Sequence, residues 1–373
     1  MTNCKKYDMI DIIIQNVSKE LENMKQKRIW AIPEYSKAKI NNAGKIIAET
    51  ASKNTAKNTL EYKQALEILN NWRSAHAYPL NVITNNLRRN NPNAIVVQRL
   101  KRLDSIIGKI ERYPTMSLYR MQDLGGCRVI VDSIDEVYES VKKFKGSKIR
   151  HIFKRENDYI ENPKESGYRS YHVVYQFQSD KIDTYNKNIL IEIQFRTKLQ
   201  HIWATAVEMM GIYTKSNLKS SQGNRDVLRF FTLVSSIFAI KENKPICPNT
   251  SNDINVLIKE IKQLDKEYNI VSTLSGLNIS IDYTSKKYSH NKNLYYILLL
   301  DYQKKVVSVR PFISTKIENA TRAYNQIENA YEDSHSKNVV LVSASSFDIL
   351  KAAYPNYFVD ISNFISILRD ILN

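Results

Sequence analysis

The sequence predicts a mixed fold of the α+β or α/β type. It should have a helical N-terminal region, a mixed β-sheet core flanked by helices, and a smaller C-terminal α+β domain. Apolar residues follow helical spacing up to about residue 112 and then form short strand-like runs between amphipathic stretches. A polar, turn-rich segment at 242–253 precedes a third region, so we place two domains at 1–240 and 254–373.

The N-terminal region is predicted to consist of several helices. Up to residue 112 it contains only two glycines, Gly44 and Gly108, and it lacks the alternation typical of strands. Its apolar residues recur at helical intervals, as in Ile10, Ile13, Ile14, Val17 and Leu21.

Strands and helices then alternate along the rest of the chain. In the core we expect strands at 127–131, 148–153, 170–178 and 189–195 and helices at 134–144 and 198–210. In the C-terminal region we expect helices at 254–269, 315–331 and 361–372, a further short helix, and strands near 277–284, 294–301, 304–310 and 338–343.

The composition is that of a globular cytoplasmic protein. Hydrophobic residues make up 43% of the chain, mean hydropathy is −0.42, and no run approaches the ~18 apolar residues that a membrane span needs. The N-terminus lacks the apolar core of a signal peptide. Three scattered cysteines argue against a disulfide framework or a zinc ribbon.

The net charge of +17 is concentrated in the first 230 residues, which hold 39 basic and 24 acidic side chains. Residues 231–373 hold 16 and 14. A positive field attracts phosphates and polyanions such as nucleic acids. A lysine-rich proteome is the simpler explanation of the total, although it accounts less well for the asymmetry.

A turn between Asn162 and His172 carries two cations, two tyrosines and a histidine, with the sequence Asn-Pro-Lys-Glu-Ser-Gly-Tyr-Arg-Ser-Tyr-His. Turns that only connect elements usually hold small polar residues. The turn leads into an alternating run that predicts a strand. A rigid strand with a cationic, aromatic loop suits an anionic, ring-bearing ligand such as a nucleotide.

Two carboxylates are candidates for a magnesium site. Asp123 precedes a buried strand, and Glu192 shares one strand face with Gln194 and Arg196. Magnesium sites often combine one or two carboxylates with substrate phosphates. A turn aspartate and the solvated face of a sheet are the common structural alternatives.

Two basic segments could contact phosphates. On a helix, Ser105, Lys109 and Arg112 would share one face, close to Arg99 and Lys101, as a triphosphate clamp or as a solvated basic face. The second segment suits nucleic-acid backbone contact or an exposed helix end, and its cations include Lys142, Lys143, Lys145, Lys148 and Arg150.

Four motifs together resemble those of the RelA/SpoT nucleotide pyrophosphokinases, in the family's order over roughly residues 95–211. They are Arg99-Leu-Lys101 with Ser105 and Lys109; Asp123-Leu-Gly-Gly-Cys-Arg128; Asn162-Pro-Lys164 with Gly167-Tyr168-Arg169-Ser170-Tyr-His172; and Glu192-Ile-Gln194-Phe-Arg196-Thr197 followed by His201 and Trp203. The chain contains no P-loop, dinucleotide fingerprint or HExxH motif.

The resemblance implies transfer of pyrophosphate from ATP to a ribose hydroxyl of an acceptor. It implies that Asp123 binds Mg²⁺, that Tyr168 stacks on the acceptor base, and that Glu192 binds metal or deprotonates the hydroxyl. The implied ATP-binding residues are Arg99, Lys101, Ser105, Lys109 and Arg112, and the implied acceptor-binding residues are Lys164, Tyr168, Arg169, His172, Gln194 and Arg196.

Within the family, the chain looks most like the fused toxin–antitoxin (CapRel-type) branch of phage defence. This resemblance implies transfer to the 3′ CCA end of tRNA and a degenerate zinc-finger-like C-terminal domain. That domain blocks the site, with Tyr354 and Tyr357 as the inhibitory pair, until a phage capsid protein binds. Truncation before about Asp253 is then expected to release the toxin. We expect a monomer that binds neither DNA nor membranes.

Two other functions remain open. One is an alarmone synthetase that transfers pyrophosphate to GDP or GTP and carries a regulatory C-terminal domain. The other is an RNA-binding module with an inactive transferase core, against which the presence of Asp123, Tyr168 and Glu192 argues.

Overall fold

The structure is a computed structural model. It describes residues 11–17, 30–52, 59–113, 115–214, 223–275, 280–283, 294–301, 303–313, 317–331, 337–355 and 361–372.

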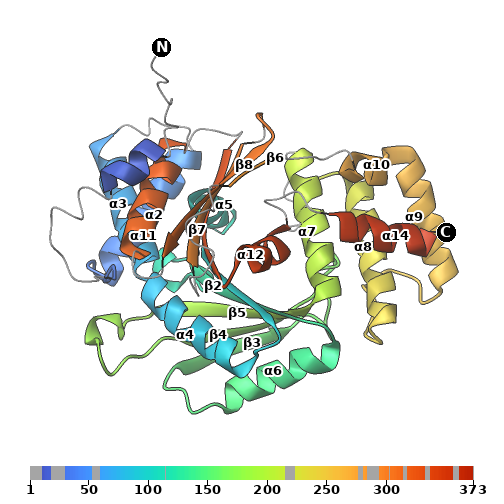
Figure 1. Cartoon of the computed structure of the whole chain (residues 1–373), viewed down its shortest axis with the longest axis horizontal. Coiled ribbons are helices and arrows are strands. Elements are labelled where there is room, and N and C mark those ends of the chain that lie inside the picture. Colours follow the sequence, from blue (N-terminus) through green and yellow to red (C-terminus); the bar gives the residue numbers. More distant parts are fainter. Residues whose placement is uncertain are drawn as a thin grey trace.

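The described strands form one curved sheet that runs through both halves of the chain (Figure 1). Its nine strands lie in the order β3-β4-β5-β2-β1-β9-β7-β8-β6. The pairs β2/β5 and β6/β8 are parallel, and the remaining neighbours are antiparallel. The strands are β1 (Ile95–Leu100), β2 (Gly125–Val131), β3 (Ile152–Asp158), β4 (Tyr171–Gln176), β5 (Leu190–Thr197), β6 (Ser280–Tyr283), β7 (Leu294–Asp301), β8 (Val306–Ile313) and β9 (Lys337–Ala344).

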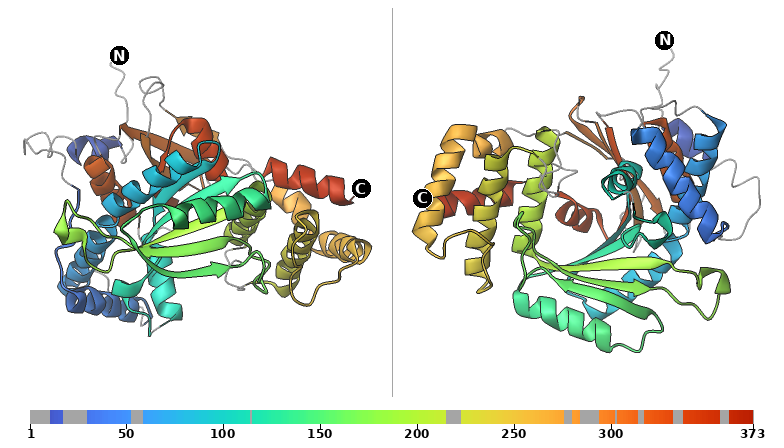
Figure 2. Two further views of the ribbon diagram at one scale, coloured as in Figure 1. Left: turned by 90° about the horizontal axis from the view of Figure 1, so that it is seen from below. Right: turned by 180° about the vertical axis from the view of Figure 1, so that it is seen from behind.

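Helices cover both faces of the sheet and form a bundle beside it (Figures 1 and 2). They are α2 (Lys37–Ser52), α3 (Leu60–Ser74), α4 (Ala77–Asn90), α5 (Leu103–Arg112), α6 (Ile134–Gly146), α7 (Lys198–Tyr213), α8 (Arg225–Lys241), α9 (Ile254–Tyr268), α10 (Ile270–Ser275), α11 (Ile317–Ala330), α12 (Phe347–Ala353) and α14 (Ser362–Leu372). Helix α12 lies on the inner face of the curved sheet, between the strands and α7 (Figure 1).

Alternation along the strands assigns each face to its own core. On β7, Tyr296, Leu298 and Leu300 pack with α12 on one face, whereas Tyr295 and Ile297 pack with α11 on the other. The α12 face also contains Val97 of β1 and Ile130 of β2. The N- and C-terminal halves of the chain therefore share one hydrophobic core.

The helical bundle also combines the two halves of the chain. Helices α7 and α8 pack with α9, α10 and α14 around buried residues such as Trp203, Phe231, Leu257 and Phe364. The segment 242–253 is a loop, as predicted, but sheet and bundle both continue across it. The division into domains 1–240 and 254–373 stays a prediction, and the described residues do not show a zinc-finger-like C-terminal domain.

The mixed fold with its helix-flanked sheet is confirmed. Most elements from β2 to α14 lie where they were expected, but helices α8 and α10 were not predicted. One strand was missed: β1 lies where only helices were predicted. Its run Ile95-Val96-Val97 consists of β-branched residues, which favour strands. Strand β3 begins at Ile152 rather than at 148. None of the described helices is both long and apolar enough to cross a bilayer.

Candidate active site

Strand register brings two of the three predicted catalytic residues, Asp123 and Glu192, to one cavity. Gly126 of β2 lies beside Arg99 of β1 and Glu192 of β5, and Arg128 lies beside Gln194. Because paired residues on neighbouring strands point to the same face, these side chains line one surface. The cavity is lined by Arg99, Lys101, Asp123, Gly126, Cys127, Arg128, Glu192, Gln194 and Tyr354.

Asp123 lies directly before β2 and binds two lysines. One carboxylate oxygen accepts a hydrogen bond from Lys101 Nζ and the other from Lys109 Nζ, each at 2.8 Å. Burial alone would raise the pKa of Asp123, but the two ammonium groups hold it far below its usual range. Burial lowers the pKa of Lys101, and Asp123 opposes that effect. The three side chains form a net cationic cluster that suits a phosphate group.

Glu192 belongs to a hydrogen-bonded chain that begins at the predicted acceptor loop. The Tyr168 hydroxyl lies 2.9 Å from His172 Nε2, and His172 Nδ1 lies 3.2 Å from Glu192 Oε1. Gln194 Nε2 donates to the other carboxylate oxygen at 2.8 Å.

The charges of these hydrogen-bonded side chains shift one another's pKa values. Burial would lower the pKa of His172, but Tyr168 and Glu192 raise it to about 9. Burial would raise the pKa of Tyr168, but His172 and Arg196 lower it to about 8. The pKa of Glu192 is lowered, because His172 and Gln194 together outweigh burial. The arrangement therefore keeps Glu192 ionised and holds its carboxylate in a fixed orientation.

Buried arginines converge beside this chain. Arg196 is 2% exposed, and burial together with the Arg128 charge lowers its pKa well below the usual range. Burial and Arg99 likewise lower the pKa of Arg128. Among the described residues, Nε of Arg128 and Nε of Arg196 have no hydrogen-bond partner. Guanidinium groups held close together without enough acceptors favour an anionic ligand.

The C-terminal end of helix α12 contacts Arg128 and His201. Arg128 donates to the carbonyl of Ala353 at 3.2 Å, and His201 Nε2 lies 3.0 Å from the carbonyl of Ala352. Tyr354 follows directly, is 2% exposed, and donates its hydroxyl to the carbonyl of Gln98 at 3.0 Å. The Arg128 guanidinium lies 5.8 Å from the centre of the Tyr354 ring. A C-terminal aromatic side chain therefore forms one wall of the cavity.

The loop before β4 has a backbone that requires glycine. Gly167 has φ +86°, and a Cβ there would lie 3.0 Å from Trp203 and from Ser235. Lys164 places its ammonium 4.4 Å from the ring centre of Tyr159 and 5.4 Å from that of Tyr168. The loop thus presents a cation and aromatic rings beside Glu192, as predicted.

Arg169 has a different role from the predicted acceptor contact. It is buried and donates to Ser235 Oγ and to the carbonyls of Ile160 and Pro245. These bonds anchor the loop to α8 and to the segment that follows α8. We therefore assign Arg169 a structural role.

The remaining predicted residues lie farther from the cavity wall. Ser105 and Arg112 lie on α5 with Lys109, and Arg112 is exposed. In the second basic segment Lys143, Lys145 and Arg150 pair with acids, namely Glu139, Glu156 and Asp180. These pairs reduce the net positive charge of the segment that was predicted to contact nucleic acid. Lys142 and Lys148 also belong to that segment. Tyr357 lies outside the described residues.

Sequence reasoning missed Arg128 as a site residue. It stands two residues after Gly126 on β2, so strand alternation places both on one face. The sequence signal that could have identified Arg128 was its spacing of two residues from Gly126 on the same strand. The Ala353 and Tyr354 contacts join residues more than two hundred positions apart, for which no local pattern exists.

The comparisons with known proteins concern this same part of the chain. A family model described as a region found in RelA / SpoT proteins matches residues 98–218. GTP pyrophosphokinase YwaC of Bacillus subtilis is 30% identical over 163 residues, which cover 42% of this chain and 74% of that protein. The chain belongs to the RelA/SpoT family.

A second curated relative and a solved structure also match this chain. GTP pyrophosphokinase YjbM of Bacillus subtilis is 32% identical over 129 residues, which span 34% of this chain and 60% of YjbM. A solved GTP pyrophosphokinase family protein from Streptococcus pneumoniae is 28% identical, with a TM-score of 0.38. That match covers 50% of this chain and 91% of the other.

Proposed function

We propose that this RelA/SpoT protein is an ATP-dependent pyrophosphokinase whose site is blocked by its own helix α12. The observation that carries the proposal is the single cavity that joins two carboxylates, Asp123 and Glu192, to a group of lysines and arginines. Transfer of a phosphoryl-type group depends mainly on positioning and on neutralising charge. This cavity offers both beside a carboxylate able to act as a base.

In the proposed reaction, an acceptor ribose hydroxyl attacks the β-phosphorus of ATP. The bond from that phosphorus to the bridging oxygen of AMP breaks, AMP leaves, and the hydroxyl proton passes to Glu192. Lys101, Lys109 and Arg128 neutralise the phosphates, and Tyr168 lies beside Glu192 as a platform for the acceptor base. His172 and Gln194 hold the Glu192 carboxylate in place through its two oxygens.

The carboxylates also fit a magnesium ion shared with the nucleotide. Among the described residues no three metal-ligating side chains gather in one place, so the protein alone offers at most a partial ligand set. Magnesium usually takes one or two carboxylates and completes its shell with phosphates and water. Asp123 and Glu192 would hold the ion, which would neutralise phosphate charge.

The block by α12 is proposed from its contacts. Arg128 already binds the Ala353 carbonyl and faces the Tyr354 ring, so a bound nucleotide must displace both. These contacts support the inhibitory role predicted for Tyr354. The role of Tyr357 and the release of the block by a phage protein stay predictions.

For the acceptor we favour a guanine nucleotide over tRNA, which is the reverse of the order suggested by the resemblance to the toxin branch. The matching relatives are named GTP pyrophosphokinases. The one observation that favours tRNA is the excess of cations in the first 230 residues. Ion pairing of Lys143, Lys145 and Arg150 weakens that argument.

The decisive experiment incubates the full chain and its Tyr354→Ala variant with γ-labelled ATP and, separately, GDP, GTP or deacylated tRNA. We expect label on the guanine nucleotides and release of AMP. Label on tRNA alone would overturn the acceptor assignment. No transfer to any acceptor by either protein would overturn the pyrophosphokinase itself.

A further inference from the structure

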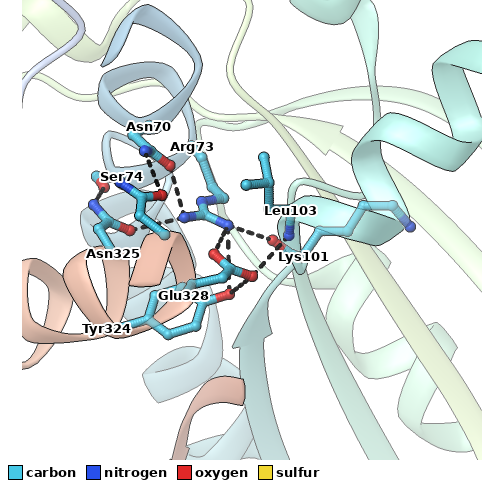
Figure 3. A network of polar contacts seen from close by, with 9 residues as sticks. Asn70, Arg73, Ser74, Lys101, Leu103, Tyr324, Asn325 and Glu328 are labelled. Carbon is cyan, nitrogen blue, oxygen red and sulfur yellow. Dashed lines mark hydrogen bonds and ion pairs between the residues drawn. The ribbon is translucent and has the colours of Figure 1, made fainter. Parts of the chain in front are cut away.

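A buried polar network joins helix α11, in the C-terminal half of the chain, to the segment that carries the site lysines (Figure 3). Its centre is the Arg73–Glu328 ion pair between α3 and α11. Arg73 is 0% exposed and Glu328 is 9% exposed. A buried charge is tolerated only when its partner and its remaining hydrogen-bonding groups are in place.

Helix α5 begins on this network. The backbone N–H of Leu103, the first residue of α5, donates to Glu328 Oε1 at 2.8 Å. The preceding residue, Arg102, provides no side-chain cap to the helix. A helix start leaves unpaired N–H groups and a partial positive charge, so a carboxylate stabilises it. Glu328, which lies 225 positions from Leu103 in the sequence, therefore caps α5.

The same network holds the residue that links β1 to α5. Arg73 NH1 lies 3.4 Å from the carbonyl oxygen of Lys101. Figure 3 shows this carbonyl facing the network while the Lys101 side chain runs away from it. That side chain ends on Asp123, where Lys109 of α5 also ends. One face of the segment 101–109 meets α3 and α11, and the other presents two ammonium groups to the site.

Helix α11 is itself fixed by several bonds on one side. Asn325 Oδ1 accepts from Arg73 NH2 at 2.8 Å, and its amide donates to Ser74 Oγ at 3.0 Å. The Tyr324 hydroxyl donates to Glu328 Oε1 at 2.9 Å. Glu328 therefore has a defined position relative to α3, and it transmits that position to the first turn of α5.

We propose that Glu328 is a positioning residue for nucleotide binding: from the C-terminal half it sets the orientation of α5 and thereby the spacing of Lys101 and Lys109 at Asp123. The inference rests on the proposed function only for the role of these lysines in binding ATP. It gives the C-terminal half a supporting part in the site, in addition to the block by α12.

A matched pair of variants isolates the hydrogen bond to Leu103. Arg73→Met with Glu328→Gln removes both buried charges and retains a side-chain oxygen for the Leu103 N–H. Arg73→Met with Glu328→Met removes that acceptor at similar side-chain volume. Neither variant leaves an unpaired buried charge, and such replacements of ion pairs are often tolerated. Glu318→Gln on the outer side of α11, where Glu318 pairs with Arg322, is the control.

The first measurement is amide hydrogen exchange of residues 103–107 without nucleotide. We expect exchange on the order of 5-fold faster in the Met/Met variant than in the Met/Gln variant, the size of effect of one lost helix cap. Equal exchange in the two variants would overturn the proposal. This measurement is independent of whether the protein transfers pyrophosphate.

The second measurement is the affinity for ATP and the steady-state kinetics of the same full-length variants made in the Tyr354→Ala background, which removes the proposed block. We expect the Met/Met variant to bind ATP on the order of 5-fold more weakly and to raise KM by the same factor, with kcat changed by less than about 2-fold. The Glu318→Gln control, made in the same background, should match Tyr354→Ala. Equal ATP affinity in the matched pair would also overturn the proposal, whereas a Tyr354→Ala protein that binds no ATP would overturn only the proposed function.

Discussion

Among single residues, Glu192 connects the largest number of site features. It receives hydrogen bonds from His172 and Gln194 and lines the cavity with Asp123 and Arg128. Its environment keeps the carboxylate ionised although it is partly shielded from solvent. A base at this position needs both ionisation and a fixed orientation, and the neighbours supply them.

Glu192→Gln should therefore abolish transfer with little effect on the binding of ATP measured without magnesium. Loss of a general base lowers kcat by about 10²- to 10⁴-fold, while the cations that hold the phosphates are unchanged. Labelled-ATP kinetics and ATP binding measure the two effects. Glu156→Gln, on the surface strand β3, is the matched control, since Glu156 pairs with Lys145 and Tyr171 and does not line the cavity. A Glu192→Gln enzyme within tenfold of the wild type would exclude Glu192 as the base.

The His172–Glu192 pair predicts a pH dependence of stability. The pKa of His172 is raised to about 9 from 6.5, so its contribution is complete below 6.5 and is lost as pH rises through 9. The pKa of Glu192 is lowered from 4.5, so its contribution is complete above 4.5 and is lost at lower pH. The stability difference between wild type and His172→Asn in urea unfolding should therefore be largest between pH 4.5 and 6.5. A difference that does not change up to pH ~9.5, above the raised His172 pKa, would contradict the pairing.

At the scale of elements, α12 and the loop before β4 both lie next to residues of the site. Both depend on contacts between distant parts of the chain: α12 on Arg128 and His201, and the loop on Ser235 of α8. Changes in these elements should alter access and stability more than the chemistry itself.

Tyr354→Ala should open the cavity. Removing the ring deletes its packing on Arg128 and its bond to the Gln98 carbonyl, so a nucleotide no longer competes with them. We expect at least about 10-fold tighter ATP binding by calorimetry, equivalent to about 1.4 kcal/mol. Tyr354→Phe keeps the ring and should remain blocked. Unchanged ATP affinity in a folded Ala variant would show that Tyr354 does not inhibit.

Gly167→Ala should destabilise the protein through the loop before β4. The residue has φ +86°, and an added Cβ would lie 3.0 Å from its nearest neighbours, so the free energy of unfolding should fall by about 1–3 kcal/mol. Gly146→Ala, at the end of α6 with nothing within 4 Å, should be neutral or stabilising. Urea unfolding compares the two, and equal effects would argue against the strained turn.

Local patterns predicted most of these elements and much of the site. Alternation around Glu192 and the turn residues of 162–172 are local signals, and both lie where expected. Strand β1 was predicted as part of the helical region, because it has only six residues and ends just before a helix. The positions of Tyr354 on Arg128 and of Glu328 on Leu103 arise from pairing across the whole chain, and a single sequence holds no local trace of them.

For the whole molecule, the decisive feature is the sheet that both halves of the chain build. Strand β1 pairs with β2 on one side and with β9 on the other. Val97 and Ile130 complete a core whose other buried members come from the C-terminal half. The proposed block and the strands that complete this core therefore both come from the C-terminal half of the chain.

This architecture alters the expected result of truncation before Asp253. Such a protein loses β6–β9, α11 and α12, which exposes the edge of β1 and leaves Arg73 buried without Glu328. An exposed strand edge next to apolar residues promotes aggregation. We expect an insoluble or aggregated product by size-exclusion chromatography, with Tyr354→Ala as the soluble comparison. A monomeric, active truncated protein would contradict a shared core.

Because β1 pairs with β9, this part of the sheet can form only late in the synthesis of the chain on the ribosome. Ser343, the partner of Gln98, is synthesised roughly 245 residues later, on the order of 12–50 s at 5–20 residues per second. Until then α5 lacks its Glu328 cap. Tyr354 emerges only 26 residues after Glu328. A newborn chain thus gains the Glu328 cap of α5 and the Tyr354 side chain, which we propose blocks the site, within a few seconds of each other.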